Sequence, residues 1–209
     1  MIIKRTMTAK KLAAFCMACF FLFFLLGWAI KYKNPWLLAF DKKMNQMIYS
    51  GISERLTPIA KIMSHLSEFY FCLVLVLFIS IVLVLIKKGW TALIFLGNYL
   101  GSRVMDIITK NWVGRNRPIA GNGASFPSGH MVNAAVFYGF ILYLLLNSMG
   151  PERRLKMTNS FLFFYLIFLG LVGWSRVYLK EHYTTDIIGG ALLGFTCLSI
   201  GILLKESEL

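Results

Sequence analysis

The sequence predicts an all-α, polytopic membrane protein with six transmembrane helices and an interfacial amphipathic helix. Hydrophobic residues make up 58% of its 209 residues and charged residues only 15%, a composition typical of membrane proteins. The apolar residues lie in runs that approach the length of about 20 residues needed to cross a bilayer. Because these runs occupy most of the chain, we expect a single integral membrane domain over residues 1–209.

Six apolar runs are candidates for the transmembrane helices. They cover about residues 12–30, 69–86, 90–109, 131–147, 161–179 and 187–204. The first run follows basic residues, as the apolar part of a signal peptide does, but no small-residue cleavage site comes after it. We therefore expect this first run to be retained as a span.

The longest connection between runs, residues 31–68, has the pattern of an amphipathic helix. Its apolar residues recur every three or four positions with charged residues between them, which indicates a helix lying in the membrane interface. These apolar residues are Trp36, Phe40, Met44, Met47, Ile48 and Ile52. Packing against the spans and a part in lipid access both fit this pattern.

Two pairs of glycines stand four residues apart within apolar runs. Gly97 and Gly101 lie in the third run, and Gly190 and Gly194 lie in the sixth. Such spacing lets two membrane helices approach closely. We interpret both pairs as structural.

Charge and cysteine content exclude several classes of function. The net charge is +13, but the basic residues flank apolar runs, where they meet anionic lipid headgroups. We therefore expect no nucleic-acid partner. All four cysteines lie inside apolar runs, and Cys16 and Cys19 form a C-x-x-C without a second pair or a nearby histidine. This pattern favours small buried side chains, with neither a disulfide nor a metal site.

The distribution of basic residues predicts the orientation in the membrane. With six spans, both termini lie on one side, where the short segments carry ten Lys and Arg residues. The opposite side carries eleven, of which five belong to the polar clusters described below. Because basic loops stay in the cytoplasm, setting these five aside predicts cytoplasmic termini and polar clusters that face away from the cytoplasm.

The first two polar clusters flank one short connection. The first, "KNWVGRNRP", runs from Lys110 to Pro118; on a continued helix Lys110 and Arg117 share a face, and Pro118 would end the helix. The second, "SFPSGH", runs from Ser125 to His130 and combines a turn with the start of the next helix, which predicts an anion site. The connection itself, residues 119–124, is too short to form a lid.

The third cluster, "SRVYLKEHYTTD", lies between the last two apolar runs, at residues 175–186. His182 and Asp186 are four residues apart, one turn of a helix. Asp186 can then bind one ring nitrogen of His182 and leave the other free as a nucleophile or base. Glu181 would point away from that face, so we place it outside the site.

The alternation of spans brings all three clusters to the same side of the membrane. Together they supply cations, backbone donors and two imidazoles, which is the chemistry of a site for a phosphoryl group. The expected phosphate-binding residues are Lys110, Arg117, Ser128, Gly129 and Arg176, with His130 and His182 available for chemistry. Because acidic residues do not cluster there, we expect no metal ion and no cofactor.

The three clusters resemble the signature motifs of the type 2 phosphatidic acid phosphatase (PAP2) superfamily. The matching patterns are K-x6-RP, PSGH and SR-x5-H-x3-D, eleven positions in the same order. The resemblance covers nearly the whole chain and implies an all-helical core like that shared with the haloperoxidases. Met131 departs from the family, in which a small residue often follows the PSGH histidine, and this affects only the pocket wall.

The resemblance also implies a role for each catalytic residue. His182 would attack phosphorus to form a phosphohistidine, Asp186 would orient it, and His130 would protonate the leaving oxygen and later activate water. The family implies a bacterial plasma membrane protein whose lipid substrate is phosphatidylglycerophosphate, undecaprenyl pyrophosphate or phosphatidic acid, and the cationic cluster suits a phosphomonoester or a diphosphate. The sequence does not indicate the oligomeric state.

Two other functions are compatible with parts of the pattern. Vanadium haloperoxidases share the motifs, but they are large soluble proteins, unlike a chain with six apolar runs. A transporter or sensor would bind a lipid phosphate without turnover, and Arg103 and Asp106 inside the third run are the residues that would favour it. Their spacing also allows a mutual ion pair that supports Lys110, and the presence of both histidines favours catalysis.

Overall fold

The computed structural model describes residues 2–119 and 123–207, and all regular secondary structure in these ranges is helical. The all-α prediction is therefore confirmed. The predicted short connection at residues 119–124 falls partly on residues 120–122, which lie outside the described ranges. The helices are α1 (Ile2–Lys31), α2 (Pro35–Tyr49), α3 (Thr57–Leu66), α4 (Phe69–Leu85), α5 (Gly89–Val113), α6 (Gly129–Ser148), α7 (Pro151–Tyr178) and α8 (Thr184–Ser207).

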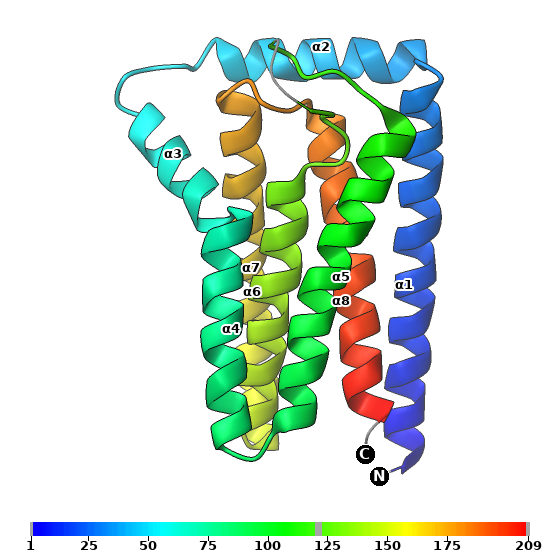
Figure 1. Cartoon of the computed structure of the whole chain (residues 1–209), viewed down its shortest axis with the longest axis vertical. Helices are drawn as coiled ribbons and strands as arrows, with labels where there is room; N and C mark the ends of the chain where they lie inside the picture. Colours follow the sequence, from blue (N-terminus) through cyan, green and yellow to red (C-terminus); the bar gives the residue numbers. More distant parts are fainter. Residues whose placement is uncertain (1, 120–122, 208–209) are drawn as a thin grey trace.

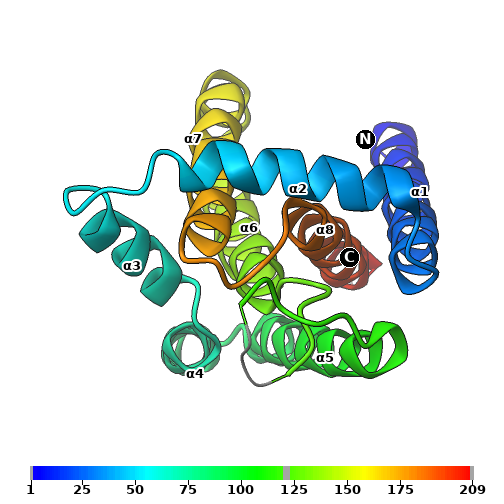
Figure 2. The same cartoon turned by 90° about the horizontal axis from the view of Figure 1, so that it is seen from above.

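Six long helices run side by side, and α2 lies across one end of them (Figure 1). Viewed from that end, α6 occupies the centre, with α5, α7 and α8 around it, while α1 and α4 lie at the periphery (Figure 2). The start of α1 and the end of α8 lie together at the end of the bundle opposite to α2. Aromatic residues of α5 and α6 form the centre of the core, where Phe95 stacks against Phe137 and Phe140.

Four of the described helices are long and apolar enough to cross a membrane by themselves: α1 from Ala9 onward, α6, α7 and α8. The pair α3 and α4, bent by 45° at a short break, makes a fifth if it is counted as one span. Helix α5 coincides with the third predicted span but carries Arg103, Asp106 and Lys110 in its second half. The membrane-spanning character of the bundle is therefore clear from four or five helices.

The segment of residues 31–68 forms two helices, α2 and α3, in place of the single amphipathic helix predicted. Asn34 caps α2 by accepting from the amides of Trp36 and Leu37 at 3.0 and 3.3 Å, and Pro35 fits the first helical position. Trp36 is exposed, whereas Asp41 and Asn45, one turn apart, are buried. The side of α2 that faces the bundle thus carries polar residues.

Helix α5 ends earlier than the sequence predicted. Gly114 adopts a left-handed conformation with φ of +65°, and its amide donates to the Lys110 carbonyl at 2.9 Å, as at many glycine helix ends. Residues 115–119 are therefore not helical, and Pro118 does not end the helix. Lys110 and Arg117 consequently come from a helix and a loop, and the prediction that they share a helix face was wrong.

Only one of the two glycine pairs makes a close helix contact. A Cβ atom added at Gly190 would lie 2.6 Å from the Ser128 carbonyl oxygen, and one at Gly194 would lie 2.5 Å from the Ala135 Cβ. This confirms the prediction for α8, which is held tightly against the start of α6. Gly97 and Gly101 have open space around them in the described structure, so the prediction for α5 was wrong.

Candidate active site

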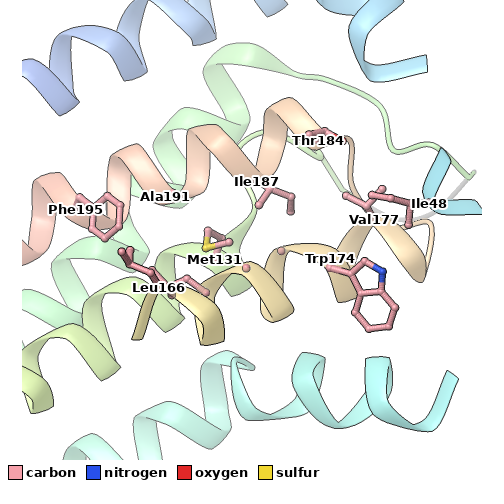
Figure 3. A pocket seen from close by; sticks show the side chains of 12 residues that line it. Ile48, Met131, Leu166, Trp174, Val177, Thr184, Ile187, Ala191 and Phe195 are labelled. Atoms are coloured by element: carbon pink, nitrogen blue, oxygen red, sulfur yellow. The ribbon is translucent and has the colours of Figure 1, made fainter. Parts of the chain in front are cut away.

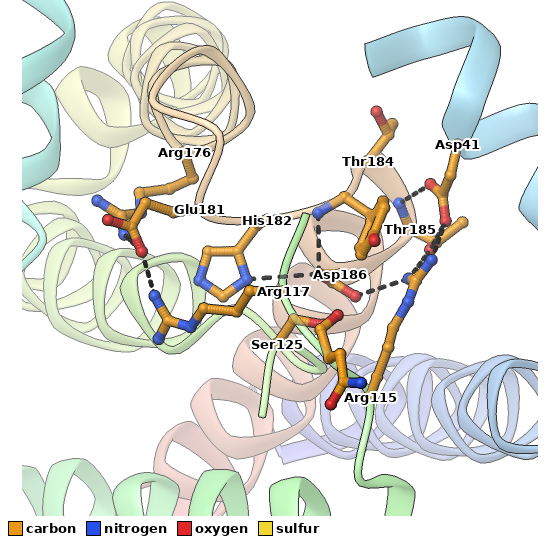
Figure 4. Close-up of polar contacts among 12 residues, drawn as sticks. Asp41, Arg115, Arg117, Ser125, Arg176, Glu181, His182, Thr184, Thr185 and Asp186 are labelled. Carbon is orange, nitrogen blue, oxygen red and sulfur yellow. Dashed lines mark hydrogen bonds and ion pairs between the residues drawn. The ribbon is translucent and has the colours of Figure 1, made fainter. Parts of the chain in front are cut away.

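The three polar clusters meet at the end of the bundle covered by α2 (Figure 4). The first comes from the end of α5 and the loop after it, the second from the start of α6, and the third from the loop between α7 and α8. The Ser128 amide donates to the Asp186 carbonyl at 3.0 Å. This bond fixes the start of α6 against the start of α8, and so joins the second cluster to the third.

His182 and Asp186 form a buried pair at the start of α8. The distance between His182 Nδ1 and Asp186 Oδ2 is 3.5 Å, and the side chains are 2% and 0% exposed. His182 precedes α8, so the two residues do not stand one turn apart within a helix as predicted. Instead, Asp186 lies in the first turn and its Oδ2 accepts from the Tyr183 amide at 2.9 Å. Nδ1 of His182 faces Asp186, which leaves Nε2 for substrate.

Burial controls the protonation of His182. Removal from water lowers the pKa of the imidazole, Asp186 opposes this effect, and the positive charges of Arg176 and Arg117 lower the pKa further. Because the pKa is lowered on balance, the ring is neutral over a wide range around neutral pH. A neutral imidazole oriented by a carboxylate can act as a nucleophile or a base.

Lys110 and Arg103 share one carboxylate on α5. Asp106 accepts from Arg103 at 2.6 Å through Oδ2 and forms an ion pair with Lys110 through Oδ1. A Cβ atom added at Gly129 would lie 3.3 Å from Lys110 Nζ, so the ammonium group lies beside the N-terminus of α6. The pair of Arg103 and Asp106 therefore supports Lys110, in agreement with the predicted ion pair.

Arg117 and Arg176 converge on the same carboxylate, that of Glu181. Glu181 Oε2 forms an ion pair with Arg117 Nη1 and lies 3.6 Å from Arg176 Nη2. Arg176 is almost fully buried and also contacts Ser64 of α3. Sequence analysis placed Glu181 outside the site because it assumed a helix through residues 181–186. In the loop observed here, the side chain turns toward the two guanidinium groups.

The start of α6 supplies the remaining predicted residues. The Ser128 amide donates to the Asp186 carbonyl in this structure. Its hydroxyl oxygen is buried and has no partner among the described residues. By its position, the Gly129 amide is among the helix-terminal donors that lack an intrahelical acceptor. His130 is half-buried in the first turn, close enough to Arg176 and His182 to interact with both electrostatically.

Sequence analysis counted Arg115 among the basic residues of the polar clusters but assigned it no role, and it missed Asp41 altogether. Arg115 Nη1 donates to Asp186 Oδ1 at 2.8 Å, and Nη2 donates to Asp41 Oδ2 of α2 at 2.6 Å. Arg115 lies inside the x6 stretch of the first motif, and Asp41 precedes it by 74 residues. No local pattern in the sequence connects these two positions.

Acidic residues in the described ranges are dispersed. No group of three or more His, Cys, Asp or Glu side chains that could hold a metal ion occurs within these ranges. The two carboxylates of the third cluster, Asp186 and Glu181, are both bound by arginine side chains. The donor set at this site therefore suits an anion.

An apolar groove of about 380 Å³ opens beside the site, between α7 and α8 (Figure 3). Three of its lining residues are close in sequence to site residues: Met131 follows His130, Val177 follows Arg176, and Thr184 lies two after His182. Farther along, it is lined by Leu166, Leu169, Ala191 and Phe195. The groove therefore runs along α7 and α8, and its lining includes direct sequence neighbours of site residues.

Comparison with known proteins agrees with this arrangement. A family model described as the PAP2 superfamily matches residues 69–206, which include all three motifs. The chain belongs to the PAP2 superfamily. The resemblance inferred from the motifs is thereby confirmed.

Two curated proteins resemble the chain over more than half of its length. Phosphatidylglycerophosphatase B of Bacillus subtilis is 31% identical over 175 residues, which are 79% of this chain and 74% of that protein. Lipid phosphate phosphatase delta of Arabidopsis thaliana is 24% identical over 58% of this chain and 31% of its own length.

Two solved structures share the fold. The crystal structure of a transmembrane PAP2 type phosphatidylglycerolphosphate phosphatase from B. subtilis superposes with a TM-score of 0.79 and 28% identity, covering 92% of this chain and 95% of that one. LpxE of Aquifex aeolicus superposes with a TM-score of 0.56 over 77% of this chain and 93% of that one. At 19% identity, LpxE shows a common fold alone.

Proposed function

We propose that this PAP2 protein is a lipid phosphatase that hydrolyses a phosphomonoester or diphosphate on a membrane lipid and releases inorganic phosphate. The observation that carries the proposal is the position of His182. It is buried, its Nδ1 faces Asp186 at 3.5 Å, and its ring lies beside the cluster of Arg117 and Arg176 (Figure 4). A nucleophile beside cationic donors is the arrangement that phosphoryl transfer requires.

The phosphoryl group would bind among the cations. Arg117 and Arg176 offer guanidinium groups that match phosphate oxygens, and their Nε atoms are buried without a partner among the described residues. Lys110 adds a point charge beside the N-terminus of α6, where the Ser128 hydroxyl and the Gly129 amide add neutral donors. Phosphate would displace the Glu181 carboxylate from the two arginines.

The reaction would proceed in two steps. Nε2 of His182 attacks phosphorus and the bond to the leaving oxygen breaks. His130, protonated as an imidazolium when the anionic phosphoryl group is bound beside it, donates its proton to that oxygen. His130, now neutral, then takes a proton from water as the water oxygen attacks phosphorus. The bond between phosphorus and nitrogen breaks, and phosphate leaves. Asp186 holds the correct tautomer of His182 and stabilises positive charge on the ring.

The apolar groove suits the tail of a lipid substrate. Its lining is almost entirely hydrocarbon and includes Met131 and Val177, the sequence neighbours of His130 and Arg176. A headgroup in the cationic cluster would then place a tail along α7 and α8 (Figure 3). The resemblance to phosphatidylglycerophosphatase B favours phosphatidylglycerophosphate. Phosphatidic acid and undecaprenyl pyrophosphate are the other substrates to compare.

We further propose that the chain forms one integral membrane domain with six spans, α1, α4, α5, α6, α7 and α8, in a bacterial plasma membrane. The arrangement in Figure 1 supports this, because all six helices run alongside one another and the site lies at the end opposite to the start of α1 and the end of α8. The distribution of basic residues supports cytoplasmic termini and an extracytoplasmic site.

The proposal is tested by phosphate release from a panel of these lipids, with purified protein in detergent and in bilayers. We expect turnover by the wild type and none by His182→Ala. Brief reaction with substrate labelled at the phosphoryl group should leave acid-labile label on the wild type only. Binding of the lipid without phosphate release would refute catalysis and support a lipid-phosphate transporter or sensor.

A further inference from the structure

A chain of buried ion pairs connects the catalytic pair to the surface helix α2 (Figure 4). Asp186 faces Nδ1 of His182 at 3.5 Å on one side and binds Arg115 on the other, and Arg115 reaches Asp41 with its second terminal nitrogen. The side chains of Arg115 and Asp41 are 10% and 2% exposed. The charges are thus screened little by solvent and act on one another at short range.

The contacts of Asp186 determine which way its carboxylate faces. Oδ1 accepts from Arg115 at 2.8 Å, whereas Oδ2 accepts from the Tyr183 amide at 2.9 Å and faces His182. A carboxylate held at both oxygens cannot rotate, so the oxygen that faces the imidazole is fixed. Arg115 supplies half of this restraint.

Arg115 is itself held from several directions. The Tyr183 ring lies 3.8 Å from its guanidinium carbon, and Nη1 also donates to the Thr185 hydroxyl at 2.7 Å. Asp41 binds Nη2 at 2.6 Å and accepts from the Thr185 amide at 2.9 Å and hydroxyl at 2.7 Å. Asp41 therefore fixes Arg115 and the first turn of α8 together.

We propose that Arg115 and Asp41 are positioning residues of the phosphatase reaction, through which α2 holds Asp186 in the orientation that directs His182 at phosphorus. This inference rests on the proposed function. Neither residue faces the side of His182 on which Arg117 and Arg176 lie, so we assign them no contact with substrate. Their effect is expected in the chemical step, with substrate binding preserved.

The test compares Arg115→Gln, Arg115→Lys and Asp41→Asn with the wild type, and uses Lys43→Gln, an exposed charge change on α2, as the matched control. We expect kcat to fall by about 10- to 100-fold in Arg115→Gln, as is typical when an orienting partner is lost, and by less in the other two variants. KM should stay within about threefold of the wild-type value, because neither residue contacts the substrate and ground-state binding is unchanged. Lys43→Gln should behave as the wild type.

The pH profile separates positioning from general destabilisation. The charged or titratable groups around His182 are Asp186 on α8, Arg176 on α7, Arg117 in the loop after α5 and His130 on α6. Without the positive charge of Arg115, Asp186 stabilises protonated His182 more strongly. The acid limb of kcat/KM should then move to higher pH in Arg115→Gln and stay in place in Arg115→Lys.

A double-mutant cycle with Asp186→Asn completes the test, with residual rates measured on radiolabelled lipid. If Arg115 acts through Asp186, adding Arg115→Gln to Asp186→Asn should lower kcat little further. Equal losses in both backgrounds with an unmoved acid limb, or a raised KM with unchanged kcat, would overturn the inference. Absence of turnover in the wild type would instead refute the proposed function itself.

Discussion

Glu181→Gln is expected to tighten substrate binding, because Glu181 competes with phosphate for the two arginines. Its carboxylate binds Arg117 and lies 3.6 Å from Arg176, where the phosphoryl oxygens are proposed to bind. Substrate must first displace this internal anion. Replacing the carboxylate by a neutral amide of the same size removes the competition while preserving the shape of the loop.

The size of the effect follows from the exposure of the groups. The Glu181 side chain is 41% exposed and that of Arg176 only 6%, so the interaction lies near the upper end of the range for partly exposed ion pairs, about 1 kcal/mol. This corresponds to about a fivefold change in an equilibrium constant. KM and the inhibition constant of inorganic phosphate should therefore both fall about fivefold, with kcat nearly unchanged.

The assay is steady-state phosphate release at fixed detergent concentration, with inorganic phosphate as a competitive inhibitor. Glu152→Gln, which makes the same charge change at the start of α7, is the control and should leave both constants unaltered. A higher KM in Glu181→Gln would show that the carboxylate holds the arginines in place for substrate. The reasoning from competition would then be wrong.

Three further predictions concern the metal, the membrane orientation and the proton donor. Activity should survive EDTA; loss restored by Mg²⁺ would contradict a metal-free mechanism. Cysteine replacing Glu54, in the loop beside α2, should react with an impermeant reagent on intact cells, and cysteine replacing Glu152 only after lysis; the reverse would invert the orientation. His130→Ala should lower kcat by about 10²- to 10⁴-fold for an alkoxide leaving group and by less for phosphate or nitrophenolate; equal losses would argue against His130 as the acid.

The parts of the site that the sequence predicted best are those set by short-range spacing. His182 and Asp186 are four residues apart, so they could be expected to meet whether or not a helix joined them. The structure gives the pair a different geometry, with Asp186 in the first turn of α8 and His182 before it. The residue types and their spacing were sufficient to predict that the two side chains meet, but not to predict the backbone conformation that brings them together.

The end of α5 at Gly114 could have been predicted from the sequence. Gly114 stands three residues before Arg117, and glycine often ends a helix by adopting a left-handed conformation. Pro118 also predicts a helix end, because proline cannot continue a helix. Both residues disfavour a helix, and α5 ends at Gly114 because it comes first along the chain. As a result, Arg117 and Arg115 lie on a loop and reach opposite sides of the pair formed by His182 and Asp186 (Figure 4).

The glycine pairs show the limit of a spacing rule. Gly97 with Gly101 and Gly190 with Gly194 have the same spacing, but only the second pair faces another helix at short range. Spacing places both members of a pair on one face of the helix, whereas the packing of the whole bundle decides what that face meets. A pattern within one helix does not contain this information.

Helix α2 shows why the remaining site residues could not be predicted. Its apolar residues indicated an interfacial helix, and the usual expectation is that the side facing the protein is apolar. Here the buried side carries Asp41 and Asn45, because what lies beneath it is the charged network of Arg115 and the start of α8. Hydrophobic contact with lipid remains available to Trp36 and Met47 on the exposed side. In a membrane protein with a polar site at the interface, the polar side of such a helix is therefore the one to examine for residues that support the site.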